Sequence, residues 1–211
     1  MKDVLLVTYA SLDALPSLSI RYDGMLSAYR QQKLARLKDE ADRARGMLAE
    51  LCLLEAVRRV EPSCALPLSI GTEPNGKPYL INSPLHISLS HAGTYAAAAV
   101  STQPLGVDIE RTRKVSESVA RRIATESEWA GLQEKGITNE SFRDLFSAKE
   151  SLVKRDGAGL MALKQVDSTK TNAVRQLWFA DYVLSVASDL TAEWEVYSCG
   201  KDGLFCLHCC S

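Results

Sequence analysis

The chain has 211 residues, of which 46% are hydrophobic and 24% are charged, the composition of an ordinary globular protein. This length allows one large domain or two small ones, with a core large enough to need no disulfide bonds. A formal net charge of −1 excludes the strongly basic surface expected of a nucleic-acid-binding protein. Asp3 and Asp13 interrupt the apolar stretch at the N-terminus and no run approaches a membrane span, so the sequence predicts a cytoplasmic protein without membrane contact.

The first 60 residues predict a strand followed by helix. Residues 3–9 (DVLLVTY) are typical of a strand, and between about 24 and 60 the apolar residues recur at helical spacing. The helical stretch is also the most basic part of the chain, and it contains Arg30, Lys33 and Arg45. For most of its cations the ordinary interpretation is a solvated helix face with ion pairs four residues apart.

The remaining residues mix strands and helices in no regular order. A turn-rich loop is expected at 74–78 (PNGKP). Helices are expected at 116–135 and 141–155, and strands at 85–90, 95–101, 105–110, 176–187, 193–198 and 204–210. Because strands and helices do not alternate strictly, the sequence predicts an α+β fold.

Four of the six cysteines lie near the C-terminus together with His208: Cys199, Cys206, Cys209 and Cys210. Thiolates and imidazole are the ligands that zinc prefers, so a zinc site is one interpretation. The simpler interpretation is a final strand, because no second C-x-x-C pair accompanies the first. Reduced cysteines agree with a cytoplasmic location.

Two carboxylates share one face of the predicted strand at 105–110. Successive strand residues point to opposite faces, so Asp108 and Glu110 lie on one face while Val107 and Ile109 lie on the other. Such a pair can hold Mg²⁺ from one side, with waters and substrate phosphates completing the coordination. The alternative is an edge strand with a solvated face, and the pentapeptide GVDIE alone favours that alternative.

A group of polar residues ends the predicted strand at 85–90. Ser90 is followed by His91 and then by Gly93, so a hydroxyl, an imidazole and turn N–H groups are available to phosphate oxygens. Ser90 and His91 face apart on a strand, which places them poorly as a nucleophile and its base. A plain hairpin turn is the alternative interpretation of this motif.

The predicted helix at 141–155 places Lys149 near the middle of its apolar stripe. A lysine on a buried stripe is costly unless a partner or ligand compensates its charge. Glu150 is its neighbour, and Lys154 lies one turn further along beside Glu150. A phosphorylated substrate with a metal ion would satisfy all three charges, so we expect Lys149 to face inward toward a ligand site.

The segment GVDIE at 106–110, followed by FSAKESLVK at 146–154, resembles the paired signature of the 4′-phosphopantetheinyl transferases. Within that superfamily the chain resembles the surfactin-synthetase-activating branch. The match runs from about residue 25 to 190. Supporting motifs stand in order: GKPYL at 76–80, ISLSHAG at 87–93, PLGVDIE at 104–110, TESEW at 125–129 and GAGL at 157–160.

The resemblance implies an enzyme, a holo-[carrier protein] synthase. Such enzymes transfer the phosphopantetheine arm of coenzyme A to a serine of an apo acyl or peptidyl carrier protein, which is an acidic helical bundle, and release adenosine 3′,5′-bisphosphate. The implied fold is two similar α+β halves with pseudo-twofold symmetry and coenzyme A between them. The halves would be 1–104 and 105–211, and a monomer is expected because one chain supplies both walls.

The resemblance also implies roles for individual residues. The implied Mg²⁺ ligands are Asp108, Glu110 and Glu150. Groups implied to bind the phosphates of coenzyme A are Lys154, Lys149, His91 and Ser90. Further implied coenzyme contacts are Lys77 of the GKP motif, Arg30 and Lys33 at the 3′-phosphate, and Arg45.

The residue that accepts the serine proton is left open by the resemblance. Glu150 could act directly or through a metal-bound water, and Glu128 of TESEW matches a family glutamate that is sometimes given a catalytic role. The alternative for Glu128 is a helix N-terminal glutamate that favours the helix dipole.

Two departures from the family pattern concern Gly46, where the family often has a hydroxyl residue, and the tail beyond about 190. We expect the tail to add strands to the second half.

Two other functions stay open: a Mg²⁺-dependent phosphohydrolase of nucleotides or diphosphates, and a non-catalytic coenzyme A-binding protein. Five cations have two interpretations, a basic strip on which the carrier docks or the solvated start of a helix. They are Arg111, Arg113, Lys114, Arg121 and Arg122.

Overall fold

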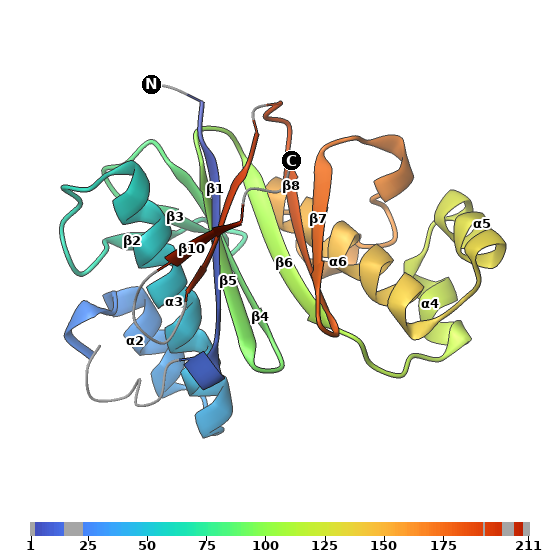
Figure 1. Cartoon of the computed structure of the whole chain (residues 1–211), viewed down its shortest axis with the longest axis horizontal. Coiled ribbons are helices and arrows are strands. Elements are labelled where there is room, and N and C mark those ends of the chain that lie inside the picture. The colour runs from blue at the N-terminus through green and yellow to red at the C-terminus, as the bar shows by residue number, and fades with distance from the viewer. Residues whose placement is uncertain (1–2, 15–22, 192, 200–204, 209–211) are drawn as a thin grey trace.

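The computed structural model describes residues 3–14, 23–191, 193–199 and 205–208 (Figure 1). Helices and strands are mixed along these residues, and the strands form two larger sheets and one short hairpin. The predicted α+β class is therefore confirmed. The expected pseudo-twofold similarity of the two halves stays a prediction.

The first sheet has five strands in the order β10-β9-β1-β5-β4. Their bounds are β1 Leu5–Ser11, β4 His86–Ala92, β5 Tyr95–Ser101, β9 Glu195–Cys199 and β10 Phe205–His208. Strand β1 is buried on both faces, and its side chains alternate between two hydrophobic clusters. Leu6 and Ala10 belong to one cluster, and Leu5, Val7 and Tyr9 to the other.

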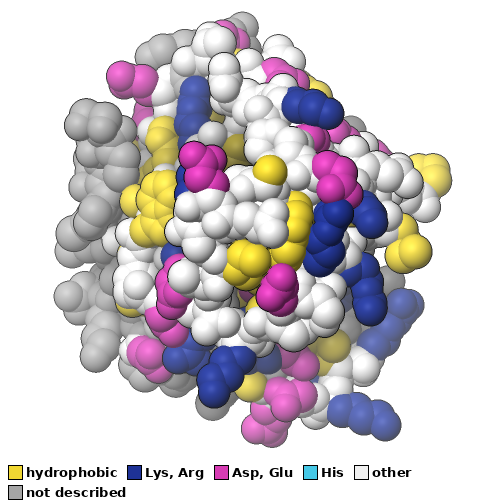
Figure 2. Space-filling model, turned by 90° about the vertical axis from the view of Figure 1, so that its right-hand side faces the viewer, with side chains coloured by type: hydrophobic (Ala, Val, Ile, Leu, Met, Phe, Trp, Pro, Cys, Tyr) yellow, Lys and Arg dark blue, Asp and Glu magenta, His cyan; other side chains and the backbone are white. Residues whose placement is uncertain are grey.

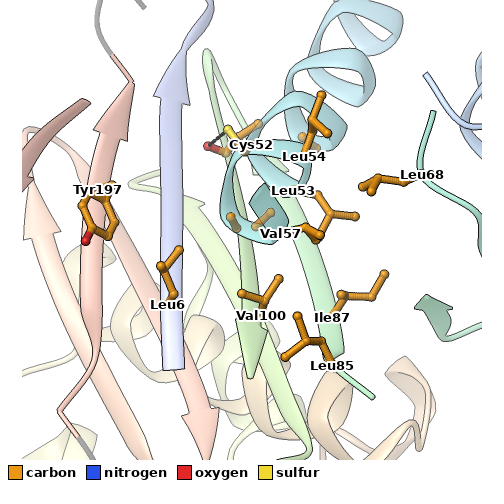
Figure 3. Close-up of a cluster of buried hydrophobic side chains, with 14 of the residues drawn as sticks. Leu6, Cys52, Leu53, Leu54, Val57, Leu68, Leu85, Ile87, Val100 and Tyr197 are labelled. Atoms are coloured by element: carbon orange, nitrogen blue, oxygen red, sulfur yellow. Dashed lines mark hydrogen bonds between the residues drawn. The ribbon is translucent and has the colours of Figure 1, made fainter. Parts of the chain in front are cut away.

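Helix α3 (Glu40–Val60) covers one face of this sheet, and helix α2 (Ala28–Ala35) packs against α3 (Figure 1). The predicted helical stretch at 24–60 is thus two helices. Its second part begins anew at Asp39, whose side chain accepts a hydrogen bond from the Asp42 N–H. Figure 3 shows Leu53 and Val57 of α3 lying against Val100 of β5, with Ile87 of β4 beside them. Full burial of a leucine such as Leu53 contributes roughly 1.5–3 kcal/mol.

The second sheet has three antiparallel strands in the order β6-β8-β7, so the last strand in sequence lies in the middle. Its strands are β6 Leu105–Arg111, β7 Val174–Phe179 and β8 Tyr182–Ser188. Helix α6 (Asn139–Asp156) packs on this sheet, while α4 (Glu117–Ile123) and α5 (Glu126–Lys135) lie further out (Figure 1). The two sheets meet along β4 and β6, where the Val107 N–H donates to Oγ of Ser88 at 2.9 Å.

A short hairpin follows α3 and was not predicted. Strands β2 (Ile70–Thr72) and β3 (Pro78–Leu80) pair antiparallel. The predicted loop at 74–78 is the turn between them. Single 3₁₀ turns complete the described elements at Leu12–Ala14, Asp23–Met25, Leu160–Ala162 and Ser168–Lys170.

The tail does not extend the second sheet, so that expectation is wrong. Strand β9 pairs parallel with β1, and β10 pairs with β9, so both belong to the first sheet. Because β5 occupies only one edge of β1, the other edge is open to β9. The two hydrophobic clusters that contain side chains of β1 also contain side chains of β9, Val196 in one and Tyr197 in the other. The strand predicted at 204–210 is confirmed at 205–208, while Cys209 and Cys210 lie outside the described residues.

No helix in the described part of the chain is both long enough and apolar enough to span a membrane.

Candidate active site

A pocket of about 460 Å³ lies where the two sheets meet, and both halves of the chain line it. From the first half come α2, the turn at 75–78 and strand β4. From the second half come β6 and α6, with Gly157 and Gly159 after the helix. The pocket contains nine of the twelve side chains expected at the site: Arg30, Lys33, Lys77, Ser90, His91, Asp108, Glu110, Glu150 and Lys154.

Asp108 is the most buried acid of the pocket, with 1% of its surface exposed. Its Oδ1 accepts hydrogen bonds from Oγ of Ser90 at 2.9 Å and from Nζ of Lys154 at 2.5 Å. Its Oδ2 is buried and has no hydrogen-bond partner among the described residues. Strand alternation explains its direction, because Val107 and Ile109 point the other way into a hydrophobic cluster. One acceptor atom is therefore left for a ligand.

Gly106 lets helix α6 approach strand β6 closely enough for these contacts. A Cβ at position 106 would collide with the carbonyl oxygen of Ser151 and the main-chain nitrogen of Arg155. It would also lie 2.9 Å from Cβ of Lys154. The glycine of GVDIE thus sets the distance between the strand that carries Asp108 and the helix that carries Lys154.

Glu110 and Glu150 lie in the same pocket as Asp108 and share its electrostatic surroundings. Burial raises the pKa of Glu110 to about 7, and the negative charge of Asp108 adds to that effect. Burial likewise raises the pKa of Glu150 to about 7, again with Asp108 as the next cause. Three carboxyl groups gathered this closely favour a cation between them.

Lys154 is the cation that the chain itself supplies to these acids. Its Nζ lies 2.5 Å from Oδ1 of Asp108 and 3.5 Å from Oε2 of Glu150. Burial opposes the lysine's charge, but the two carboxylates outweigh it and raise the pKa of Lys154. The ammonium also donates to Oγ of Ser90 at 3.0 Å.

His91, at the end of strand β4, lies among cations. Burial lowers the pKa of His91, and the charges of Arg45, Arg30 and Lys154 lower it further. An imidazole whose protonation is opposed by three positive groups marks a region of positive potential. An anionic ligand would be attracted there.

Lys77 and Lys33 line the pocket from the hairpin turn and from α2. Nζ of Lys77 donates to the carbonyl oxygen of Arg155 at 2.5 Å, one of the last carbonyls of α6. Nζ of Lys33 lies 4.6 Å from the ring centre of Tyr29. Arg45, in contrast, does not line the pocket, because its guanidinium donates to the Gly93 carbonyl at 3.2 Å and to Asp42.

Lys149 and Glu128 do not lie at the pocket, which corrects the explanation of the inward lysine. Nζ of Lys149 lies 2.5 Å from Oε2 of Glu128, and neither side chain is exposed. The lysine also donates to the Val166 carbonyl, and Ser168 N–H donates to Oε1 of Glu128 at 2.7 Å. The compensating partner of Lys149 is therefore a glutamate of α5 and not a ligand. Glu128 also accepts from Thr125 N–H at 2.8 Å in a helix capping box.

The fit of the pocket to Mg²⁺ follows from its oxygen atoms. No group of three or more His, Cys, Asp or Glu side chains in the part of the chain described is arranged to hold a metal ion on its own. Mg²⁺ is commonly held by one or two carboxylates together with substrate phosphates and waters. The partnerless Oδ2 of Asp108, with the carboxyls of Glu110 and Glu150 in the same pocket, fits such a shared site.

Sequence reasoning missed Glu50, which is 2% exposed in α3 and binds Arg30 from behind the pocket wall. The available signal was a carboxylate among the buried positions Met47, Leu48, Leu53 and Leu54. The same kind of signal singled out Lys149.

An α+β protein with acids and cations gathered in a pocket between two sheets belongs to a class that can bind phosphorylated ligands. Residues 104–194 match the model of the 4′-phosphopantetheinyl transferase superfamily. This segment contains Asp108, Glu110, Glu150 and Lys154. The match and the relatives below confirm the resemblance inferred from the sequence, and over this segment the chain is similar to that superfamily.

The curated relatives of this chain are named 4′-phosphopantetheinyl transferases. The 4′-phosphopantetheinyl transferase Sfp of Bacillus subtilis (strain 168) is 29% identical over 143 residues, which are 66% of this chain and 64% of the relative. Another 4′-phosphopantetheinyl transferase of Bacillus subtilis is 30% identical over 138 residues, 64% of this chain and 62% of the relative. The 4′-phosphopantetheinyl transferase gsp of Aneurinibacillus migulanus is 28% identical over 137 residues, 64% of this chain and 57% of the relative. The matched region thus spans less than two thirds of each relative's length.

Proposed function

We propose that this protein transfers the 4′-phosphopantetheine group of coenzyme A to a serine hydroxyl of an apo acyl or peptidyl carrier protein and releases adenosine 3′,5′-bisphosphate. The observation that carries this proposal is the cluster of Asp108, Lys154 and Ser90 in the pocket between the sheets. The superfamily match over 104–194 and the names of the relatives support it.

The reaction would be a displacement at the β-phosphorus of coenzyme A. The serine oxygen forms a bond to that phosphorus while the bond to the bridging oxygen breaks, and that oxygen leaves with its electron pair on adenosine 3′,5′-bisphosphate. Glu150 would accept the serine proton, because its carboxyl lies in the pocket, 3.5 Å from Nζ of Lys154. Glu128 has no such role in this proposal, since its carboxylate is enclosed with Lys149.

Asp108, Glu110 and Glu150 would hold Mg²⁺ together with the diphosphate. The ion would supply positive charge that stabilises the charge developing on the phosphate oxygens. Lys154 would bind a phosphate oxygen from the same side, and Ser90 and His91 would donate hydrogen bonds from strand β4.

The rest of coenzyme A would extend along the first half of the chain. Arg30 and Lys33 of α2 would bind the 3′-phosphate, and Lys77 would bind the coenzyme from the hairpin turn. Lys149 and Arg45 are left out of this set, because Lys149 is enclosed with Glu128 and Arg45 does not line the pocket.

We further propose a monomeric, cytoplasmic enzyme made of halves 1–104 and 105–211. A pocket lined by both halves of one chain supports the monomer. For the docking of an acidic carrier, the five cations at 111–122 are less free than expected. Arg111 pairs with Asp181 at 2.6 Å, and Arg121 pairs with Glu126 at 2.5 Å. On the face of the molecule that Figure 2 shows, basic side chains gather on one side and acidic side chains lie among them. We therefore assign no docking residue.

The test is the intact mass of a carrier protein. Apo carriers from fatty-acid, polyketide and peptide synthesis are incubated with the protein, coenzyme A and Mg²⁺. We expect at least one carrier to gain one phosphopantetheine group, and none to gain it when EDTA is present. Absence of any gain across the panel, with release of inorganic phosphate from nucleotides instead, would contradict the transferase and indicate a phosphohydrolase.

A further inference from the structure

A buried ion pair lies behind the wall of the pocket, between α2 and α3. Oε2 of Glu50 accepts a hydrogen bond from Nε of Arg30 at 3.1 Å, with 2% and 10% of the two side chains exposed. Oε1 of Glu50 accepts from the Ser27 main-chain N–H at 2.5 Å. Ser27 is the N-cap of α2, and its side chain accepts from the Arg30 N–H at 3.1 Å. One carboxylate therefore holds both the Arg30 side chain and the first turn of its helix.

Gly46 of α3 leaves space for the guanidinium of Arg30. It lies one helical turn before Glu50 on α3, so both face α2. A Cβ at position 46 would lie 2.8 Å from Cδ2 of Leu34 and 3.5 Å from Nη1 of Arg30. The absence of a side chain lets α2 pack close to α3, and Glu50 then fixes the arginine from the side.

The guanidinium keeps donors for a ligand. Among the described residues, the hydrogen bonds of Arg30 use Nε and the main-chain N–H, and neither Nη1 nor Nη2 donates to another residue. The residue nevertheless lines the pocket, next to Lys33. A guanidinium with two oriented N–H groups matches the geometry of phosphate oxygens. Holding it in place before binding reduces the conformational entropy that binding would otherwise cost.

We propose that Glu50 is a positioning residue for anion recognition: it orients Arg30 so that Nη1 and Nη2 meet the 3′-phosphate of coenzyme A. Glu50 does not touch the ligand and acts through Arg30. The negative charge of Glu50 offsets the positive charge of Arg30, so the pair attracts an anion only weakly from a distance. Its main effect on binding is the fixed direction of the Arg30 N–H groups. The pair therefore distinguishes a ligand that carries this phosphate from one that lacks it. This inference rests on the proposed function, since coenzyme A supplies the phosphate.

The experiment measures dissociation constants by calorimetry, without turnover, for coenzyme A and for 3′-dephospho-coenzyme A. In Glu50→Gln we expect coenzyme A to bind about tenfold more weakly, the loss of roughly one charge-assisted hydrogen bond, while 3′-dephospho-coenzyme A binds almost as before. The matched control is Glu55→Gln, which removes another glutamate–arginine pair of α3, at 2.9 Å from Arg59 and outside the pocket. Both affinities of the control should equal those of the unaltered protein.

A double-mutant cycle separates positioning from a general structural effect. If Glu50 acts through Arg30, Glu50→Gln has no further effect on coenzyme A affinity once Arg30→Ala is present. An equal loss of affinity for both ligands, or an unchanged effect of Glu50→Gln in the Arg30→Ala background, would overturn the inference. Circular dichroism and thermal melting establish that each variant is folded.

Arg30→Lys gives a second test if Glu50→Gln does not fold. The lysine keeps the charge but lacks the Nε that Glu50 holds, so the preference for coenzyme A over its dephospho form should fall about as far as in Arg30→Ala. A preference kept by Arg30→Lys would contradict the inference. Coenzyme A binding with this preference but no transfer to any carrier would refute the transferase and leave the inference standing, whereas no coenzyme A binding by the unaltered protein would refute both.

Discussion

Nζ of Lys149 lies 2.5 Å from Oε2 of Glu128, and solvent reaches neither side chain. We expect Glu128→Ala to lower the free energy of unfolding by about 3–5 kcal/mol, because it leaves a buried ammonium without its counter-charge. Urea unfolding followed by circular dichroism measures this change. The control Glu126→Ala removes a neighbouring, exposed carboxylate from the same helix and should change stability by at most ~0.5 kcal/mol.

The catalytic interpretation of Glu128 predicts a different pattern. A variant that keeps its stability but loses turnover would indicate that Glu128 takes part in the reaction. In our interpretation, replacing both partners by apolar residues, Glu128→Leu with Lys149→Met, recovers much of the lost stability.

Asp108→Ala tests the acid cluster of the pocket. Turnover should fall by a barrier increase of about 3 kcal/mol or more, because the substitution removes a proposed metal ligand and the partner of Lys154. The measurement is the rate of carrier modification at saturating coenzyme A and increasing Mg²⁺. Glu150→Ala should behave similarly. Near-native rates in both variants would contradict the assignment of these acids to the reaction.

Gly106→Ala tests the close approach of α6 to β6. The added methyl group would collide with the main chain of α6, so we expect a loss of about 1–3 kcal/mol in stability together with a loss of turnover. Thermal melting and the carrier assay measure the two effects. Gly131→Ala is the matched control, because it lies in α5 with no atom near its Cβ position. That control should be neutral or stabilising by up to ~1 kcal/mol.

The two raised carboxyl pKa values predict how stability depends on pH. In the folded state the pKa of Glu110 and of Glu150 is about 7, compared with 4.5 for an ordinary glutamate. The folded protein therefore holds more protons than the unfolded chain between these values. The contribution of these carboxyls is fully present below pH 4.5 and is lost as the pH rises through 7.

Glu150→Gln should consequently stabilise the metal-free protein at pH 8 and have a smaller effect at pH 5. We expect its melting temperature at pH 8 to rise by about 2–4 °C, the shift that ~1 kcal/mol produces in a chain of this size. Differential scanning calorimetry in EDTA at the two pH values measures it. A lower melting temperature at pH 8 would show that the ionised carboxylate is stabilised by its neighbours instead.

Much of the site follows from residue order because strand and helix periodicity determine direction. Alternation in GVDIE places Asp108 beside Glu110, and helical spacing places Glu150 beside Lys154. The structure has both arrangements. The partner of Lys149 could not be found in this way. Glu128 is 21 residues away, and only the packing of α5 against α6 brings the two charges together.

Other features depend on contacts that no local pattern encodes. Strands β2 and β3 have three residues each, too few to show alternation. Glu50 stands among apolar residues of α3, but its partner Arg30 belongs to a separate helix. The pairing of β9 with β1 joins segments about 190 residues apart, and an alternating pattern predicts a strand without naming its neighbour.

The parallel pairing of β9 with β1 means that the first sheet is built from both extremes of the sequence. A ribosome must therefore synthesise residue 199 before that sheet can close, and until then β1 offers an unpaired edge to other chains. Dividing the chain between residues 104 and 105 would not yield two independently folding fragments. The fragment 1–104 would lack strand β9, whose Val196 and Tyr197 are buried in its two hydrophobic clusters. Co-expressed fragments would have to find each other to fold.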